Sequence, residues 1–486
     1  MFTTPSRALM LCFTLLGFAP AGFGQTVEPI PGKVEIAGTS YPYVLVPPAK
    51  IVDGQSYPLV LFLHGAGERR DDNKTQGQFP MVLAEALSKQ ARPCFVLAPQ
   101  CPQERSWVAD PSKGQAGLAD PMRAAMAALE LVVRNHPVDR ERISISGTSM
   151  GGVAAWDLAS RFPAWFSAVV PVCGGGDPNT VARLAGLPTL VWHGGTDSLA
   201  TIEMSKGMVE AMRALKLPVQ ITELPRGKPG AWMQAFSDVA CLQGLATSKR
   251  NPGGMQAETA RLLADSIDAD ERIAFLGDSI TEAGNAPAGY VDQVRSRLAE
   301  LSPKATILPA GISGHKVPDL LARYKEDVLE PRATMVFLYI GINDVWHSQG
   351  GTGTPIHEFE AGLRKLIQDF RTSGAEVVLT TPSTIGEKPQ GENGLDKMLD
   401  EFAAVSRRVA AEEGATLCDL RQSFFDYLRI FNPEDQQSGI LTSDGVHLNP
   451  AGNTFLAIEA ARALREAALK RTARRAAEAP AEEEAQ

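Results

Sequence analysis

Short apolar runs of strand length alternate with helix-length amphipathic segments along most of the chain. In the first half we expect strands over residues 59–63, 95–98, 143–146, 168–172, 189–192 and 219–224. In the second half the corresponding runs are residues 273–276, 306–309, 335–340, 377–380 and 416–419. Strands that alternate with helices are typical of a mostly parallel sheet with helices on its faces. The pattern therefore predicts an α/β fold in both halves.

The alternation is interrupted once, by the sequence Ser-Lys-Arg-Asn-Pro-Gly-Gly, which is rich in turn and breaker residues. A chain of 486 residues is also too long for one ordinary core. We therefore predict two domains, one over residues 25–247 and one over residues 257–469, joined by a linker at 248–256. A helix expected at residues 256–266 begins the second domain.

Both ends of the chain differ from the rest. Residues 1–24 carry an early basic residue, Arg7, then an apolar run, then small residues, which is the layout of a secretory signal peptide. The apolar run is shorter than the roughly 20 residues of a membrane-spanning helix, so we expect an exported protein and no integral membrane association. Residues 470–486 are Ala-rich and charged and lack an apolar stripe, which predicts a disordered tail.

Composition excludes several classes of partner and site. Hydrophobic residues make up 44% of the chain and charged residues 21%, as in globular proteins. The net charge is -9 and the basic residues are scattered, which argues against nucleic acid as a partner. The cysteine spacing does not match a metal site. Cys94 and Cys101 form either one disulfide, which export permits, or two isolated buried thiols.

Four short blocks in the second half carry the candidate chemistry: Gly-Asp-Ser-Ile at 277–280, Gly-Ile-Ser-Gly at 311–314, Gly-Ile-Asn-Asp at 341–344 and Asp-Gly-Val-His at 444–447. The first three follow predicted strands, so they meet at the carboxyl edge of the sheet, where ligands bind in such folds. Each block alone is also a common turn or loop sequence. The four together supply the parts of a serine-dependent ester hydrolase.

Each block offers a distinct group. Ser279 begins a helix after a strand, as a nucleophile placed beside helix N-H groups. His447 is the candidate base and Asp444 the acid that orients it, since a three-residue spacing in a loop brings carboxylate and imidazole together. The Gly314 N-H and the Asn343 amide are candidate oxyanion donors.

These blocks, in this order, resemble those of the GDSL or SGNH hydrolase family, and the resemblance covers about residues 272–468. It implies a flavodoxin-like three-layer α/β/α domain, an acyl-enzyme on Ser279, and no metal or organic cofactor. It also implies an oxyanion hole formed by Gly314, Asn343 and the Ser279 N-H.

The first half contains a second candidate nucleophile, Ser149, in Gly-Thr-Ser-Met-Gly between a strand and a helix. Gly65, after another strand, is placed to offer an oxyanion N-H, and Asp197 is placed as an acid. This half resembles α/β-hydrolase domains such as those of carboxylesterases and feruloyl esterases. However, Pro229 stands where that family has its histidine, and no histidine lies between His193 and His315. We therefore interpret the domain as a degenerate hydrolase whose site is vestigial.

The leading hypothesis is an exported serine esterase that removes an acyl group, with acetyl as the expected group, from a carbohydrate. Its substrate is then a small-molecule or polysaccharide ester. A lysophospholipase or general lipolytic esterase is an alternative that the same site would serve. A third hypothesis is a bifunctional protein whose N-terminal domain binds polysaccharide or retains esterase activity.

Overall fold

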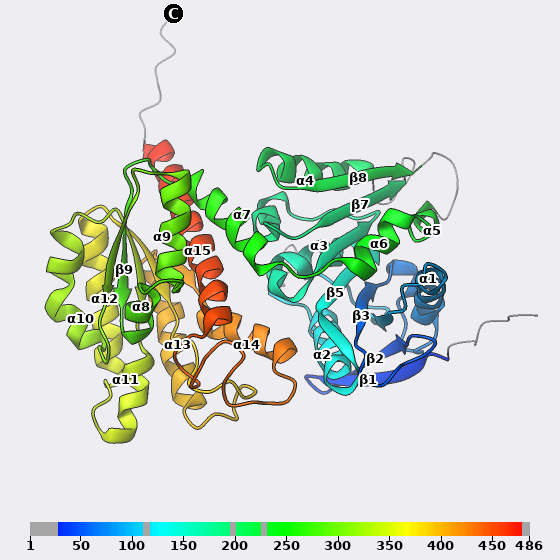
Figure 1. Ribbon diagram of the computed structural model, residues 1–486, viewed down its shortest axis with the longest axis horizontal. Coiled ribbons are helices and arrows are strands. Elements are labelled where there is room, and N and C mark those ends of the chain that lie inside the picture. Colours follow the sequence, from blue (N-terminus) through cyan, green and yellow to red (C-terminus); the bar gives the residue numbers. More distant parts are fainter. Residues whose placement is uncertain (1–27, 110–116, 195–200, 225–230, 479–486) are drawn as a thin grey trace, which may run out of the picture.

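The structure, a computed structural model, describes residues 28–109, 117–194, 201–224 and 231–478, which form two α/β domains (Figure 1). Each domain is built on its own sheet. The predicted fold class, α/β in both halves, is therefore confirmed. The predicted signal peptide lies outside the described residues.

The N-terminal domain has an eight-stranded sheet in the order β1-β2-β4-β3-β5-β6-β7-β8. β1 and β2 are antiparallel, and the strands from β4 to β8 pair in parallel. The strands are β1 (Ile30–Ile36), β2 (Thr39–Val46), β3 (Tyr57–Leu63), β4 (Phe95–Pro99), β5 (Val138–Thr148), β6 (Ala168–Val172), β7 (Thr189–Gly194) and β8 (Val219–Leu224). Every strand predicted for this half is present, and the β1–β2 hairpin is an addition to the prediction.

Helices cover both faces of this sheet: α1 (Gln78–Lys89), α2 (Asp120–Asn135), α3 (Met150–Arg161), α4 (Ile202–Ala214), α5 (Ala231–Ala235) and α6 (Val239–Thr247). Strand β3 shows why an unbroken apolar run suits this position. Leu59, Leu61 and Leu63 pack into the core beneath α2 and α3, whereas Val60 and Phe62 pack into the core beneath α1 and α6. A strand buried on both faces needs apolar side chains at every position.

The C-terminal domain has a five-stranded, fully parallel sheet in the order β10-β9-β11-β12-β13. Its strands are β9 (Arg272–Gly277), β10 (Thr306–Gly311), β11 (Met335–Tyr339), β12 (Glu376–Thr380) and β13 (Thr416–Cys418). This is the 2-1-3-4-5 order of flavodoxin-like sheets, in which the strand order reverses beside the first strand. The loops after β9, β10 and β11 therefore surround the point where such folds bind ligands.

Helices form the two outer layers of this domain, as predicted. They are α7 (Pro252–Ala264), α8 (Ser279–Gly284), α9 (Tyr290–Leu301), α10 (Val317–Tyr324), α11 (Ile342–Trp346), α12 (Ile356–Thr372), α13 (Asp396–Glu412), α14 (Leu420–Phe431) and α15 (Pro450–Glu478). α10, α12 and α13 pack together on one face, and α9 and α15 pack on the other (Figure 1). On α12 the buried residues Phe359, Leu363, Leu366 and Phe370 recur at helical spacing, which gives the helix one apolar face.

Helix α7 connects the two domains and begins earlier than predicted (Figure 1). Pro252 occupies its first turn and the Asn251 side chain accepts the Gly254 N-H, so the predicted linker at 248–256 is partly helical. Leu262 belongs to the core of the N-terminal domain, and Leu263 belongs to the core of the C-terminal domain. The helix thus contributes to both cores.

The prediction of a disordered tail is wrong for residues 470–478, because α15 extends to Glu478. Charged side chains in this segment have partners on the domain. Arg471 forms a buried ion pair with Glu271, and Arg474 pairs with Glu376 at the start of β12. These contacts fix a segment that has no apolar stripe. Residues 479–486 lie outside the described residues.

Cys94 and Cys101 are free, buried thiols. Of the two alternatives for this pair, the structure therefore supports two isolated thiols and not a disulfide. Burial raises the pKa of each thiol to about 12. Among the described helices, none combines the length and the apolar character needed to cross a membrane.

Candidate active site

Ser279 lies where strand β9 passes into helix α8. Asp278 caps this helix, because its Oδ1 atom accepts the Ile280 N-H at 3.0 Å. The cap turns the chain sharply after Gly277, so the Ser279 side chain stands at the carboxyl edge of the sheet beside the helix N-terminus.

The structure brings Ser279, His447 and Asp444 together in one hydrogen-bonded line. Ser279 Oγ lies 3.0 Å from His447 Nε2, and His447 Nδ1 lies 2.7 Å from Asp444 Oδ2. The other carboxylate oxygen of Asp444 accepts the backbone N-H groups of Val446 and His447 at 2.9 and 2.8 Å. A base with one nitrogen on a serine hydroxyl and the other on a carboxylate can remove the hydroxyl proton.

The electrostatics keep Asp444 ionised. Its partial burial would by itself raise the pKa of Asp444, but the hydrogen bonds from the His447 ring and from two backbone N-H groups outweigh this, and its pKa lies below the usual value. A carboxylate that stays charged can stabilise an imidazolium on His447. The His447 side chain is 36% exposed, so the line of residues is accessible from solvent.

The candidate oxyanion donors follow the neighbouring strands β10 and β11. Gly314 is exposed and has φ +79°, a left-handed conformation that favours glycine, and a Cβ there would meet no atom within 4 Å. Asn343 is buried, and its Nδ2 atom donates to the His315 carbonyl at 3.1 Å. The amide has a second N-H, which that bond leaves available.

Two residues that the sequence did not indicate support these donors. Glu282, on α8, accepts the Ser313 N-H at 2.8 Å and the Ser313 hydroxyl, which holds the chain next to Gly314. Arg323 donates from Nη2 to the Gly277 and Ala310 carbonyls at 2.9 and 3.0 Å, which connects the ends of β9 and β10. Glu282 lies three residues after Ser279, which is the spacing of one helical turn, but only the fold shows its partner.

Two buried carboxyl groups lie directly beside site residues. Burial raises the pKa of Asp278 to about 7 and that of Asp344 to about 6. Asp278 is fully buried, and its Oδ2 atom has no hydrogen-bond partner within the described residues. Asp344 Oδ1 accepts the Val317 N-H at 3.1 Å. Asp278 thus holds the start of α8 and Asp344 holds the start of α10.

Comparison with known proteins places the site in a family. The model of the GDSL-like lipase/acylhydrolase family matches residues 275–455. An acetylxylan esterase of Geobacillus stearothermophilus is 31% identical over 209 residues, which are 39% of this chain and 92% of that protein. The chain belongs to the GDSL-like lipase/acylhydrolase family. It is accordingly an ester hydrolase.

Other relatives of this GDSL domain are esterases as well. An isoamyl acetate-hydrolyzing esterase 1 homolog of Mus musculus is 25% identical over 203 residues, 38% of this chain and 78% of that protein. The crystal structure of an acetyl xylan esterase is 38% identical, covering 39% of this chain and 97% of that one, with a TM-score of 0.38. The family match over residues 275–455 and the 31% identical relative confirm the predicted resemblance to GDSL hydrolases.

The domain that precedes the GDSL domain is an α/β-hydrolase, and the model of the dienelactone hydrolase family matches residues 81–226. Ser149 has φ 53° and ψ -116°, a strained conformation for a residue other than glycine, at the turn between β5 and α3. A Cβ at Gly151 would lie 1.8 Å from the Leu63 carbonyl, so this turn requires glycine. Gly65 lies near Ser149, and Asp197 lies outside the described residues.

No histidine of the described chain forms a hydrogen bond with Ser149. His64 has both ring nitrogens engaged, because Nδ1 lies 2.7 Å from the Gly65 carbonyl and Nε2 accepts the Cys101 N-H at 2.9 Å. Burial lowers the pKa of His64 to about 4. His193 Nδ1 lies 2.8 Å from Ser205 Oγ. The turn that presents Ser149 is thus formed, but neither His64 nor His193 is placed as a base for this serine.

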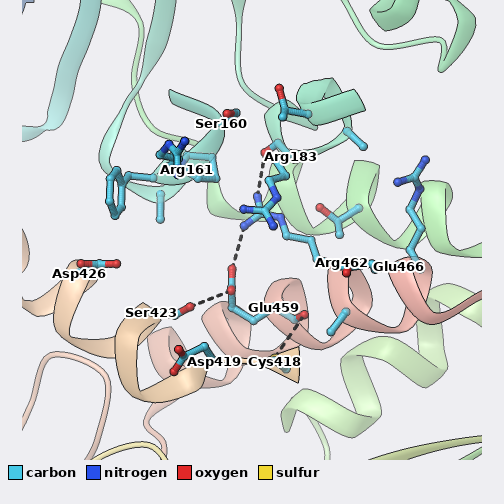
Figure 2. Close-up of a pocket in the computed structure, with 18 of the residues that line it drawn as sticks. Ser160, Arg161, Arg183, Cys418, Asp419, Ser423, Asp426, Glu459, Arg462 and Glu466 are labelled. Atoms are coloured by element: carbon cyan, nitrogen blue, oxygen red, sulfur yellow. Dashed lines mark hydrogen bonds and ion pairs between the residues drawn. The ribbon is translucent and has the colours of Figure 1, made fainter. Parts of the chain in front are cut away.

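A cavity of about 690 Å³ lies between the α/β-hydrolase domain and the GDSL domain, away from Ser279. Figure 2 shows Arg462 of α15 bridging this space. Its guanidinium donates to Glu459 Oε1 at 2.8 Å and to the Arg183 carbonyl of the other domain at 3.2 Å. Ser423 also donates to Glu459, at 3.1 Å. The two domains are therefore connected by polar contacts as well as by helix α7, which contributes to both cores.

The described residues contain no cluster of three or more His, Cys, Asp or Glu side chains arranged to hold a metal ion.

Proposed function

We propose that this chain is an exported carbohydrate esterase that removes acetyl groups through an acyl-enzyme on Ser279. The observation that carries the proposal is the hydrogen-bonded line from Ser279 through His447 to Asp444. The signal-peptide layout of residues 1–24 supports export.

In the proposed reaction, His447 Nε2 takes the hydroxyl proton of Ser279 while Oγ attacks the ester carbonyl. The carbonyl oxygen becomes an oxyanion that the Gly314 N-H, the Asn343 amide and the Ser279 N-H bind. Collapse of this intermediate expels the alcohol, which receives the proton from His447. Water then attacks the acyl-enzyme with the same base, and acetate leaves.

The exposure of the site to solvent supports a substrate ester with a bulky alcohol part and a small acyl part. Asp444 is 49% exposed and His447 is 36% exposed, and Gly314 lies at the surface. A sugar chain can reach such a nucleophile without entering a tunnel. A long acyl chain, in contrast, gains its binding energy from a deep apolar pocket. The name of the acetylxylan esterase relative agrees with an acetylated polysaccharide as substrate.

The decisive experiment compares Ser279→Ala with Ser149→Ala. Acetate release from acetylated xylan, acetylated pectin and acetyl sugars is measured beside fatty-acid release from lysophospholipid. We expect Ser279→Ala to lose acetate release by several orders of magnitude and Ser149→Ala to retain it. Full activity in Ser279→Ala would reject the proposal, and faster fatty-acid than acetate release by the wild type would favour the lipolytic alternative.

A second function for the N-terminal domain is favoured by one observation: the strained turn at Ser149 is intact, although within the described residues no hydrogen bond joins this serine to a histidine ring. Strained turns of this kind persist where the surrounding structure holds them and occur at ligand sites. We infer that the domain contributes polysaccharide binding. Affinity electrophoresis of the Ser279→Ala protein in gels containing acetylated xylan tests this, with Ser149→Trp as the variant that fills the site. Equal migration of both proteins with and without xylan would exclude it.

A further inference from the structure

Glu387 is a fully buried carboxylate in the loop that follows β12. No lysine, arginine or histidine of the described chain forms an ion pair with it. Burying a carboxylate is costly unless hydrogen bonds replace its hydration. The partners of Glu387 therefore reveal why a carboxylate is present there.

All four side-chain hydrogen bonds of Glu387 come from one short segment. Oε2 accepts the Ile440 N-H at 2.8 Å, and Oε1 accepts the Leu441 and Thr442 N-H groups at 2.7 and 2.6 Å. Oε1 also accepts the Thr442 hydroxyl at 2.8 Å. Consecutive backbone N-H groups that converge on one anion form a strong, charge-assisted arrangement. This segment ends two residues before Asp444.

The same contacts continue into the Asp444–His447 loop. Thr442 Oγ1, which donates to Glu387, accepts the Gly445 N-H at 3.1 Å. The residue before Glu387, Gly386, donates its N-H to the Gly445 carbonyl at 2.7 Å. Glu387 and its neighbour thus hold the chain on both sides of Asp444, in a loop that has no regular secondary structure of its own.

We propose that Glu387 is a positioning residue whose charge holds the loop in the shape that directs His447 Nε2 to Ser279. This inference rests on the proposed function, because it assigns Glu387 a role in that site. Glu387 touches neither the substrate nor the reacting atoms. It acts through Thr442, and a small displacement of a base from its nucleophile can cost about 100-fold in rate.

Glu387→Gln is the first test, because glutamine keeps the shape of the side chain but removes its charge. Its amide also places an N-H group against the backbone N-H groups of residues 440–442, with which it cannot form hydrogen bonds. We expect kcat for p-nitrophenyl acetate to fall by roughly 10- to 100-fold, with KM changed less than about twofold, since the loop does not bind substrate in the proposal. Glu392→Gln is the matched control, because Glu392 is an exposed residue of the same loop. The control should keep the kcat of the wild type.

Thr442→Val and Thr442→Ser keep the test valid if Glu387→Gln does not fold. Valine removes the hydroxyl that joins Glu387 to Gly445 without changing any charge, whereas serine retains it. We expect Thr442→Val to lower kcat and to shift the acid limb of the kcat/KM profile to lower pH, because a loosened Asp444 stabilises the His447 imidazolium less. Serine should restore both values.

A wild-type kcat and pH profile in both Glu387→Gln and Thr442→Val, with Ser279→Ala inactive, would overturn the inference and leave the proposed function intact. Lowered melting temperatures with unchanged kcat would overturn it too, since they indicate a structural role alone. If Ser279→Ala were active, the proposed function would fail and this inference with it.

Discussion

His447 Nε2 lies 3.0 Å from Ser279 Oγ, although 168 residues separate them in the chain. The parallel sheet brings them together. Ser279 follows the inner strand β9, and the loop with His447 leads into α15, which packs beside β11, β12 and β13. The contact therefore depends on the folding of the whole GDSL domain.

Asp444→Asn should lower kcat for p-nitrophenyl acetate by roughly 100-fold or more, because the neutral amide cannot stabilise the imidazolium on His447. Buried triads lose more, about 10⁴-fold, but Asp444 is half exposed and water compensates in part. Glu434→Gln, an exposed change in the preceding turn, serves as the control. Unchanged turnover in Asp444→Asn would mean that Asp444 does not orient the base.

Asn343→Ala should lower kcat by about 10²- to 10³-fold if its amide binds the oxyanion. The loss should appear in kcat more than in KM, because the oxyanion exists only in the transition state and the intermediate. Asn285→Ala, at the exposed end of α8, is the comparison and should match the wild type. A rise in KM of the same size with an unchanged kcat would instead indicate that Asn343 binds the substrate in the ground state.

The buried carboxyl of Asp278 predicts a pH dependence of stability. Its pKa is raised to about 7 in the folded state by burial, above the usual 3.8. A raised pKa contributes stability that is fully present below pH 3.8 and is lost as pH rises through 7. Asp278→Asn removes this titration, so relative to the wild type the variant should gain stability between pH 4 and 8, by a few kcal/mol.

Thermal unfolding of both proteins at several pH values measures this difference. Asp270→Asn, at an exposed position, controls for the change in net charge. Parallel stability curves for the wild type and Asp278→Asn would show that the carboxyl does not titrate in this window.

The sheets and the four blocks could be predicted because they depend on local patterns. Strands buried on both faces, such as β3 and β9, need continuous apolar runs, and these runs are visible in the sequence. Ser279 and Asn343 come shortly after such strands and Gly314 comes shortly after the edge strand β10, so their common edge follows from parallel topology.

Features that depend on distant partners could not be predicted. Strand β1 is mostly exposed and turns into β2 through Ala37 and Gly38, both with positive φ, and its sequence lacks the apolar run of a core strand. Glu387 lies in a loop without a motif, and its partners at residues 440–442 are more than fifty positions away. Only the folded chain shows that this carboxylate faces backbone donors.

The end of α15 gives the last prediction, because the sequence alone suggested disorder there. Arg471 is 6% exposed and Glu271 is fully buried; Arg471 Nη1 lies 2.8 Å from Glu271 Oε1. Removing one partner of a buried ion pair leaves an uncompensated charge and costs about 3–5 kcal/mol. Arg471→Met should therefore lower the melting temperature of the GDSL domain by roughly 6–20 °C.

The double variant Arg471→Met with Glu271→Gln separates this charge effect from lost packing. Without the carboxylate no charge is left unpaired, so the double variant should recover much of the stability that Arg471→Met loses. Arg475→Met is the control, since Arg475 is 62% exposed and its ion pair with Asp268 contributes less than about 1 kcal/mol. If Arg471→Met has the melting temperature of the wild type, the Arg471–Glu271 pair does not anchor the helix, and the other contacts of residues 470–478, such as the Arg474–Glu376 pair, hold this segment.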